Sequence, residues 1–175
     1  EGGAFVDENG VPLSRPPRDW GLAVQFRDFN GDGHPDLYVC NDFHTPDRLW
    51  LNDGRGRFHA IAPTALRSTP TFSMCVDVAD FNRDGISDVA VSLASTNQLA
   101  VALGSATGLG AWTSYMVGTS PRYSTVGDFN GDGHVDVFVP QRDGQCRLFK
   151  NDGAAHFTDV AASAGDLSKP LGEAV

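Results

Sequence analysis

Short runs in which hydrophobic and polar residues alternate recur along the chain and predict β-strands rather than helices. Before each of three acidic loops the runs are residues 22–26, 75–79 and 124–126, and after each loop they are 37–39, 89–91 and 137–139. A third run follows at 48–51, 98–101 and 146–149, and a fourth opens with an aromatic residue: Phe58, Trp112 or Phe157. Helical periodicity is weak, and only residues 158–165 favour a single turn of helix.

The acidic loops mark an internal repeat, which is the first feature to look for in such a chain. Residues 28–39 read DFNGDGHPDLYV, residues 80–91 read DFNRDGISDVAV and residues 128–139 read DFNGDGHVDVFV, so their starts lie 52 and 48 residues apart. A second landmark, the turn at Asp53 or Asp152, follows its loop at nearly constant distance, and in the middle copy Gly104 stands where that turn is expected. Four short strands per unit are typical of a β-propeller blade.

The phase of the repeat sets the expected boundaries. Residues 5–7 align with 157–159, and residues 21–24 align with 172–175. We therefore expect one all-β propeller region over residues 1–175, made of four-stranded antiparallel sheets, with repeats at approximately 5–57, 58–111 and 112–156 and the start of a fourth at 157–175. Propellers have about four to eight blades. The remaining blades are expected from a longer parent chain or, alternatively, from another copy.

The amino-acid composition narrows the classes of partner that the chain is expected to bind. Of the acidic residues, 19 are Asp and 3 are Glu, and Asp suits turns and oxygen-rich metal sites. The net charge is −9 and no basic stripe is present, which argues against nucleic acid as a partner. No apolar run reaches the length of about 18 residues that a membrane span needs. Cys40, Cys75 and Cys146 are read as core residues, and one disulfide between an undetermined pair is the alternative.

Each acidic loop has the side chains of an oxygen-ligand metal site. Asp, Asn, Asp and Asp occupy positions 1, 3, 5 and 9, a Gly at position 6 permits a sharp turn, and the carbonyl at position 7 is a further ligand. The predicted ligands of the three sites are Asp28, Asn30, Asp32, His34 and Asp36; Asp80, Asn82, Asp84, Ile86 and Asp88; and Asp128, Asn130, Asp132, His134 and Asp136.

The chemistry of these donors favours Ca²⁺. They are all hard oxygens, which disfavours zinc and copper, and the site is too rich in protein ligands for typical Mg²⁺ binding. Three bound Ca²⁺ ions would change the net charge of −9 by +6, to −3, and so relieve self-repulsion. The alternative is that the loops are good turn sequences whose carboxylates cap backbone N–H groups.

The D-x-N-x-D-G-x-x-D loop between strands resembles the FG-GAP/VCBS repeat of integrin α-subunit propellers and many bacterial surface proteins. Residues 21–90, including NDFHTPDRLWLNDGRGRF and SMCVDVADFNRDG, are similar more narrowly to the cartilage-acidic-protein-like group of these repeats. The resemblance implies a seven-bladed propeller with Ca²⁺ in the turn between the first two strands of a blade. It also implies a secreted or surface-exposed protein that acts in adhesion, matrix or carbohydrate contact.

The expected function is a calcium-binding extracellular or periplasmic module that contacts a protein or cell surface. A lectin-like propeller is the alternative, in which Trp20, Trp50 and Trp112 would stack on sugars, although Trp50 and Trp112 are more simply read as core residues. No catalytic motif is found, so no enzyme activity is expected. A non-catalytic part of a secreted enzyme is a further alternative. Residues 41–44 and Asp47 are read as turn formers or an interaction surface, and residues 64–71 as an inter-blade connection.

Overall fold

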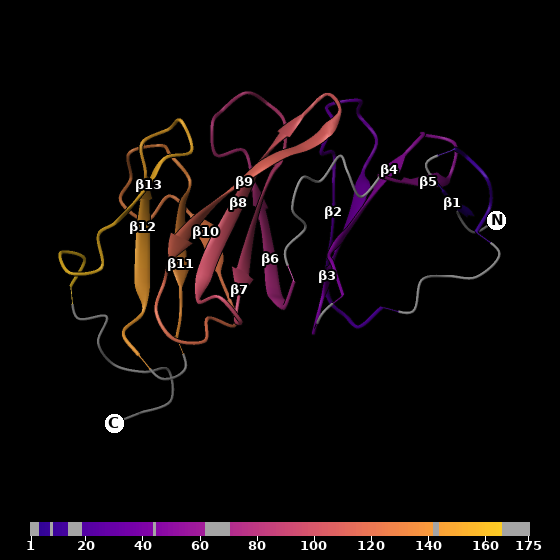
Figure 1. Cartoon of the computed structure of the whole chain (residues 1–175). Helices are drawn as coiled ribbons and strands as arrows, with labels where there is room; N and C mark the ends of the chain where they lie inside the picture. Colours follow the sequence, from indigo (N-terminus) through magenta and orange to yellow (C-terminus); the bar gives the residue numbers. More distant parts are fainter. Residues whose placement is uncertain are drawn as a thin grey trace.

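The computed structural model describes residues 4–7, 9–13, 19–43, 45–61, 71–141 and 144–165. Within these ranges the chain forms thirteen β-strands in three sheets and no helix (Figure 1). The predictions for residues 1–3 and 172–175, for His44, and for most of the inter-blade connection at residues 64–71 lie outside the described residues. The all-β prediction is confirmed.

The first sheet has five strands in the order β1-β5-β4-β3-β2. Its last four strands are antiparallel neighbours in chain order: β2 (Gly21–Arg27), β3 (Asp36–Asn41), β4 (Arg48–Asn52) and β5 (Arg57–Ala60). Strand β1 (Ala4–Val6) pairs in parallel with β5, where Phe5 lies opposite Phe58. The N-terminal segment, whose residues 5–7 align with the outer-strand residues 157–159, is therefore a fifth strand of the first sheet.

The second and third sheets each have four antiparallel strands in simple chain order. The second contains β6 (Ser73–Ala79), β7 (Asp88–Leu93), β8 (Gln98–Ser105) and β9 (Gly108–Met116). The third contains β10 (Thr125–Gly127), β11 (Asp136–Val139), β12 (Arg147–Asn151) and β13 (Phe157–Asp159). These sheets confirm four-stranded blades. Each outer strand pairs with the strand before it, so a folded blade closes one strand later than the sequence repeat that opens at Phe58 or Trp112.

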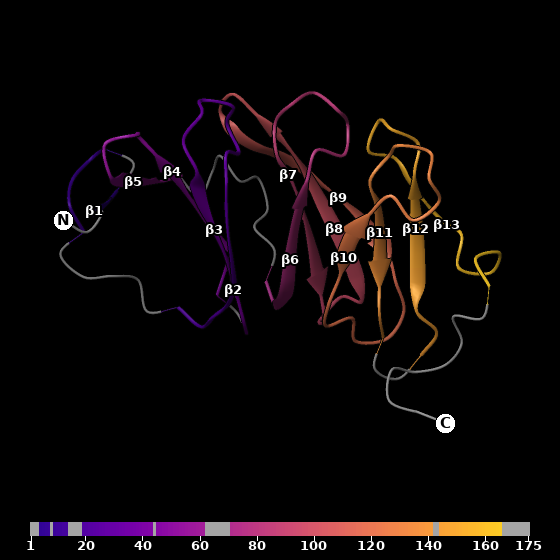
Figure 2. The ribbon, with the colours of Figure 1, turned by 180° about the vertical axis from the view of Figure 1, so that it is seen from behind.

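The three sheets stand side by side in chain order from one end of the molecule to the other (Figures 1 and 2). The first strands of the sheets are neighbours in space, because β6 packs against both β2 and β10. One core cluster fills the space between the first two sheets and includes Phe29, Tyr38, Val76 and Val91. A second fills the space between the last two sheets and includes Phe81, Leu99, Val137 and Phe149. Burial of apolar faces between sheets therefore holds the blades together.

Two local predictions were wrong. Residues 158–165 do not form a helical turn, because Thr158 belongs to β13 and a hydrogen bond from Ser163 N to Val160 O, 2.9 Å, closes a simple turn. In the second blade the hairpin turn falls between Ser105 and Gly108, since β8 runs through Gly104. Gly104 therefore aligns with Asn52, the last residue of β4, and lies one residue before the end of β8 instead of in the turn.

The cysteine and tryptophan interpretations are largely confirmed. All three cysteines are free; Cys40 and Cys146 are buried, and Cys75 is half-buried. Trp50 is buried and Trp112 packs against the first core cluster, whereas 67% of the surface of Trp20 is exposed. Among the described residues, no helix could cross a membrane.

Candidate metal centres in the three acidic loops

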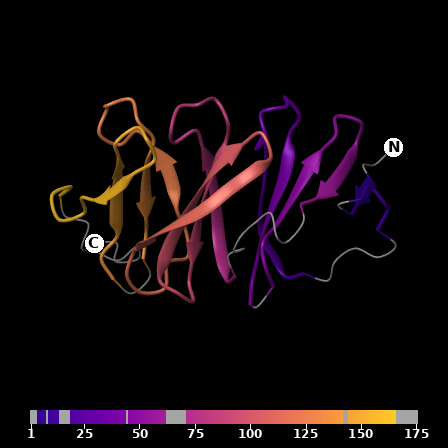
Figure 3. The ribbon, with the colours of Figure 1, turned by 45° about the horizontal axis from the view of Figure 1, so that its top comes forward.

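The three acidic loops occupy equivalent places in the fold. Each connects the first strand of its blade to the second: β2 to β3, β6 to β7 and β10 to β11. Figure 3 shows the three connections at the same end of the sheets, along one rim of the molecule. The first two loops also touch, because Ser87 N donates a hydrogen bond of 3.3 Å to Asp28 O.

The first aspartate of each loop holds the turn closed. Asp28 Oδ1 accepts a hydrogen bond of 2.7 Å from Gly31 N, and Asp28 Oδ2 accepts one of 2.8 Å from Gly33 N. Gly33 has φ of 85°, a left-handed conformation that glycine adopts without strain. Asp80 and Asp128 accept the same bonds at position 6, from Gly85 N at 2.9 Å and Gly133 N at 2.8 Å. The loop sequence therefore gives one backbone shape three times.

The residues at positions 3 and 5 face each other. Asp32 Oδ1 accepts from His34 N at 2.8 Å, and Asp32 Oδ2 accepts from Asn30 Nδ2 at 2.9 Å. In the second loop, Asn82 Nδ2 donates to Asp84 Oδ2 at the same distance of 2.9 Å. In the third loop the corresponding oxygen, Asp132 Oδ2, lies 3.0 Å from Lys150 Nζ. The side-chain oxygen at position 5 thus has a positive or partly positive group beside it in every copy.

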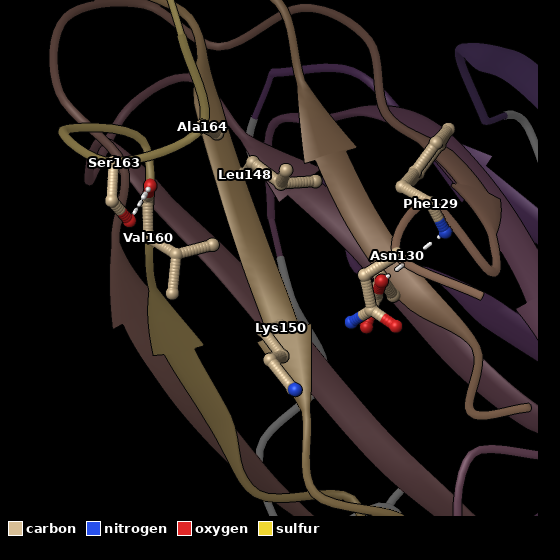
Figure 4. A pocket seen from close by; sticks show the side chains of 8 residues that line it. Phe129, Asn130, Leu148, Lys150, Val160, Ser163 and Ala164 are labelled. Carbon is tan, nitrogen blue, oxygen red and sulfur yellow. Dashed lines mark hydrogen bonds between the residues drawn. The ribbon is translucent and has the colours of Figure 1, made fainter. Parts of the chain in front are cut away.

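The last aspartate of each loop is a buried clamp. Asp36, Asp88 and Asp136 are at most 1% exposed. One carboxylate oxygen of each accepts from the backbone N–H of the phenylalanine at position 2, at 2.9, 2.7 and 3.2 Å respectively. Figure 4 draws this bond at Phe129. The other oxygen accepts from the third strand of the blade, at Asn52 N, Gly104 N and Asn151 N, at 2.8, 2.8 and 2.9 Å.

The carboxylates of a loop affect one another electrostatically. Burial raises the pKa of Asp36 above its usual value, hydrogen bonds from Asn52 and Phe29 oppose this, and the charges of Asp32 and Asp28 raise it further. Burial likewise raises the pKa of Asp88 to about 6. The folded loops therefore concentrate negative charge around a buried carboxyl group, and a cation would relieve the repulsion.

Two observations bear on whether a metal fits. The donor set in every loop is made of carboxylate and amide oxygens, which suits Ca²⁺. However, in the part of the chain that the structure describes, no three acidic, histidine or cysteine side chains converge as a metal-binding group. The carboxylates instead accept hydrogen bonds from N–H groups of their own loop, the turn chemistry that the sequence offered as the alternative. The amide of Asn30 or Asn82 and the ammonium of Lys150 stand where a cation would contact the position-5 oxygen.

The residue at position 7 packs on the next hairpin of the same blade. A Cβ atom added at Gly54 would overlap the His34 ring, and one added at Gly153 would overlap the His134 ring. In the middle blade, Ile86 takes this position and packs against Gly104. These contacts explain why a glycine recurs in the second landmark. The metal-ligand roles of the His34, Ile86 and His134 carbonyls stay predictions.

Asn41 and Asp47 close the loop between β3 and β4, since Asn41 Nδ2 also donates to Pro46 O at 2.8 Å, but the alternative that they form an interaction surface was wrong. Asn41 lies in β3, fully buried, and Asp47 is only 3% exposed. Asp47 accepts hydrogen bonds from Tyr38 Oη at 2.8 Å, Asn41 N at 2.8 Å and Ser73 Oγ at 2.6 Å. Since Ser73 begins β6, the carboxylate joins the first blade to the second. No short-range signal in the sequence distinguishes such a carboxylate from one in an exposed turn.

A second inter-blade residue was also missed by sequence reasoning. Asn151 is fully buried at the end of β12, and its Nδ2 donates to Phe81 O in the second acidic loop at 2.8 Å. The same amide donates to Val135 O at 3.0 Å and accepts from Gly153 N and Ala155 N at 3.0 and 3.1 Å. The N-D-G landmark was visible in the sequence, but the partner 70 residues away was not.

Comparisons with known proteins agree with this architecture. Among solved structures, the chain is similar to the crystal structure of BBS1N in complex with ARL6DN, soaked with lead, with a TM-score of 0.53 and 18% sequence identity. The match covers 84% of this chain and 45% of that chain, so this chain spans less than half of that protein's length, and at this identity the likeness shows the fold alone. No curated protein matches the sequence. The model of the FG-GAP-like repeat matches residues 28–91 and 128–172, more than half of the chain. The chain therefore belongs to the FG-GAP-like repeat family, and its three sheets are β-propeller blades.

Proposed function

We propose that this chain is a calcium-stabilised propeller module of an extracellular or periplasmic protein, and that it serves as an interaction scaffold rather than an enzyme. The observation that carries the proposal is the threefold recurrence of one loop geometry. Each copy places three carboxylates and an asparagine amide in nine residues, at the same end of consecutive blades.

The hydrogen bonds of the loop shape the backbone and leave part of its acceptor capacity. Asp28 Oδ1 accepts three backbone N–H groups. Each oxygen of Asp36 accepts one bond and so keeps a lone pair that a cation could use. Asp32 and Asp84 are exposed and Asp36 and Asp88 are buried, so an ion would bind between the surface of the loop and its clamp. The ion would then link the loop to the third strand of the blade through Asp36 or Asp88, which already accepts a hydrogen bond from that strand.

The proposed location follows from affinity. Sites of this ligand type in extracellular modules bind Ca²⁺ at about 10⁻⁴–10⁻³ M, which matches extracellular rather than cytosolic concentrations. At about 2 mM Ca²⁺ each such site would stabilise the folded chain by about 0.6–1.8 kcal/mol, because only the folded loop binds the ion. For a chain of this size, two or three sites correspond to a rise in melting temperature of roughly 2–20 °C.

Thermal unfolding in EGTA and in CaCl₂ tests the proposal. We expect calcium to raise the melting temperature of the 175-residue chain, and an equal concentration of MgCl₂ to raise it much less. The double variant Asp32→Asn/Asp84→Asn is the matched control, because both side chains are exposed and keep their shape. Its response to calcium should be smaller. Identical melting temperatures for the natural chain in EGTA and calcium would exclude the proposal.

The open face of the first blade supports packing against a further blade. Val24 and Phe26 on β2 are 52% and 50% exposed. Their counterparts on β6, one repeat later, are Val76 and Val78, which pack in the core between the first two sheets. We therefore propose that another blade of a longer parent chain covers this face, and that a second copy replaces it when the chain is isolated.

An exposed aromatic pair favours a second candidate function, carbohydrate binding. Trp20 and Phe43 are exposed, with ring centroids 5.8 Å apart in an edge-to-face arrangement. Such rings can stack on the apolar faces of sugars. A glycan array with the natural chain and Trp20→Ala tests this function. Binding that depends on Trp20 would favour a lectin-like module, and its absence would leave protein contact as the proposed role.

A further inference from the structure

The outermost strand of the second blade differs from its counterparts in length and charge. Strand β9 has nine residues, whereas β5 has four and includes Arg57, and β13 has three and includes Asp159. None of residues 89–121 is Asp, Glu, Lys, Arg or His, although charged residues make up 20% of the chain. The last two strands of this blade, β8 and β9, are therefore uncharged along their whole length.

Strand β9 also leaves one edge of its sheet open. It ends the strand order β6-β7-β8-β9, and among the described residues it pairs only with β8. A strand in this place directs every second N–H and C=O group away from the sheet. Proteins usually protect such an edge with a charge, a proline or a very short strand, and β9 has none of these. Its register with β8 shifts only near the hairpin turn, so residues 112–116 form a regular ladder.

Two aromatic side chains hold β9 in place from opposite faces. Trp112 packs against the first core cluster and Tyr115 against the second. The ring centroid of Tyr115 lies 6.0 Å from that of Phe149 in the third blade. The neighbouring side chains of Thr113 and Ser114 are exposed. The strand is therefore fixed by its aromatic residues, while its small uncharged side chains face solvent.

The first blade shows that an outer edge in this chain accepts another strand. Strand β1 pairs in parallel with β5, where the rings of Phe5 and Phe58 stack with their centroids 5.5 Å apart. Within the described ranges, β9 has no such strand beside it. A strand that pairs with β9 needs an open backbone edge of its own, and it meets no counter-charge there, so it should be uncharged. The chain itself provides a strand with both properties, which is β9.

We propose that β9 is a dimerisation edge, on which β9 of a second copy pairs across a two-fold axis. Such an axis brings the same edge of both copies together and makes the two strands antiparallel. The two four-stranded sheets then form one continuous sheet. Each copy has a net charge of −9, but the facing strands have none, so backbone hydrogen bonds form without like charges opposite each other. This contact uses neither the acidic loops nor the open face of the first blade.

Sedimentation velocity of the Phe26→Ser chain tests this dimer, because that variant weakens association through the open face of the first blade. Thr113→Lys adds a charge to the regular part of the edge, and Ser114→Lys does so on the opposite face of the strand. Thr107→Lys is the matched control, since it makes the same substitution at the exposed hairpin turn. We expect Phe26→Ser with and without Thr107→Lys to sediment as a dimer. Either charge on the edge should raise the dimer dissociation constant at least about tenfold.

Hydrogen exchange locates the contact. In Phe26→Ser, we expect the N–H groups of residues 110–117 to exchange more slowly as the protein concentration rises, and Thr113→Lys to remove this effect. Circular dichroism checks that each variant keeps its strands. A Phe26→Ser chain that stays monomeric, or a dimer that both edge charges leave intact, would overturn the proposal. Assemblies of Phe26→Ser that grow beyond the dimer would also overturn it, because a two-fold contact closes on itself. Each experiment gives the same readout in EGTA, so its result is separate from that of the calcium experiments.

Discussion

Asn151 tests how strongly a single side chain couples two blades. Its amide makes four hydrogen bonds, to Phe81 O, Val135 O, Gly153 N and Ala155 N. Replacement by alanine leaves these backbone groups without that partner, and the groups at Phe81 and Ala155 are in buried bonds. An orphaned buried polar group costs about 1–3 kcal/mol. We therefore expect Asn151→Ala to lower the free energy of unfolding by about 3–5 kcal/mol.

Asn52 is the matched control, because it occupies the same position in the first blade. Its side chain makes two bonds, from Nδ2 to Pro35 O at 2.9 Å and from Gly54 N to Oδ1 at 3.0 Å, both at the surface. Water replaces these partners when the side chain is removed, so Asn52→Ala should cost only about 1 kcal/mol. Both side chains lose the same atoms. The difference in free energy therefore reports the buried and inter-blade bonds of Asn151.

Urea unfolding followed by tryptophan fluorescence, at one fixed calcium concentration, measures both variants. A lower midpoint with an unchanged slope indicates a change in stability alone. Asn151→Asp adds a second test, because it keeps the shape and the oxygen that accepts from Gly153 N and Ala155 N but places a buried carboxylate oxygen against Phe81 O and Val135 O. We expect it to be no more stable than Asn151→Ala at neutral pH. If the losses of stability in Asn151→Ala and Asn52→Ala differ by less than about 0.5 kcal/mol, the coupling between blades is refuted.

Three further variants test other contacts. Gly54→Ala should cost at least about 1 kcal/mol more than Gly56→Ala, since both glycines have positive φ but only Gly54 lies under the His34 ring; equal urea midpoints would contradict this. Burial raises the pKa of Asp47 to about 6, so the folded chain holds this proton more tightly than the unfolded chain. The stability advantage of the natural chain relative to Asp47→Asn should therefore grow as pH falls from about 7 to about 4, by at most about 3 kcal/mol; a pH-independent difference in urea unfolding would refute this. Phe26→Ser should reduce self-association of the isolated chain in sedimentation, and an unchanged mass would argue against the open blade face.

The sequence predicted the blades well because their signals are local. Alternating runs, a recurring acidic loop and an aromatic residue at each outer strand determine which segments pair, and neighbouring strands are joined by short turns. Gly104 shows where local alignment failed. Gly104 lies one residue before the end of the eight-residue strand β8, and Gly108 and Gly110 follow in β9, so sequence alone did not separate the end of the strand from the turn that comes directly after it.

The inter-blade polar contacts were not predictable in the same way. Asp47 and Asn151 each join residues from different blades, 26 and 70 positions apart, and their burial depends on how whole sheets pack. The acidic loops fall between these cases. The spacing of their predicted ligands was evident in the sequence. The hydrogen bonds of Asp36 and its counterparts to the third strand were not, because the sequence does not show which N–H group of that strand lies opposite.

The most direct measurement of the central claim is the calcium content of the 175-residue chain after equilibrium dialysis against about 1 mM CaCl₂, in the range where extracellular sites of this type bind. The account predicts about two to three calcium ions per chain by elemental analysis, and fewer in Asp32→Asn/Asp84→Asn. Protein that stays folded and holds no stoichiometric calcium would contradict it, and would leave the three loops as hydrogen-bonded turns.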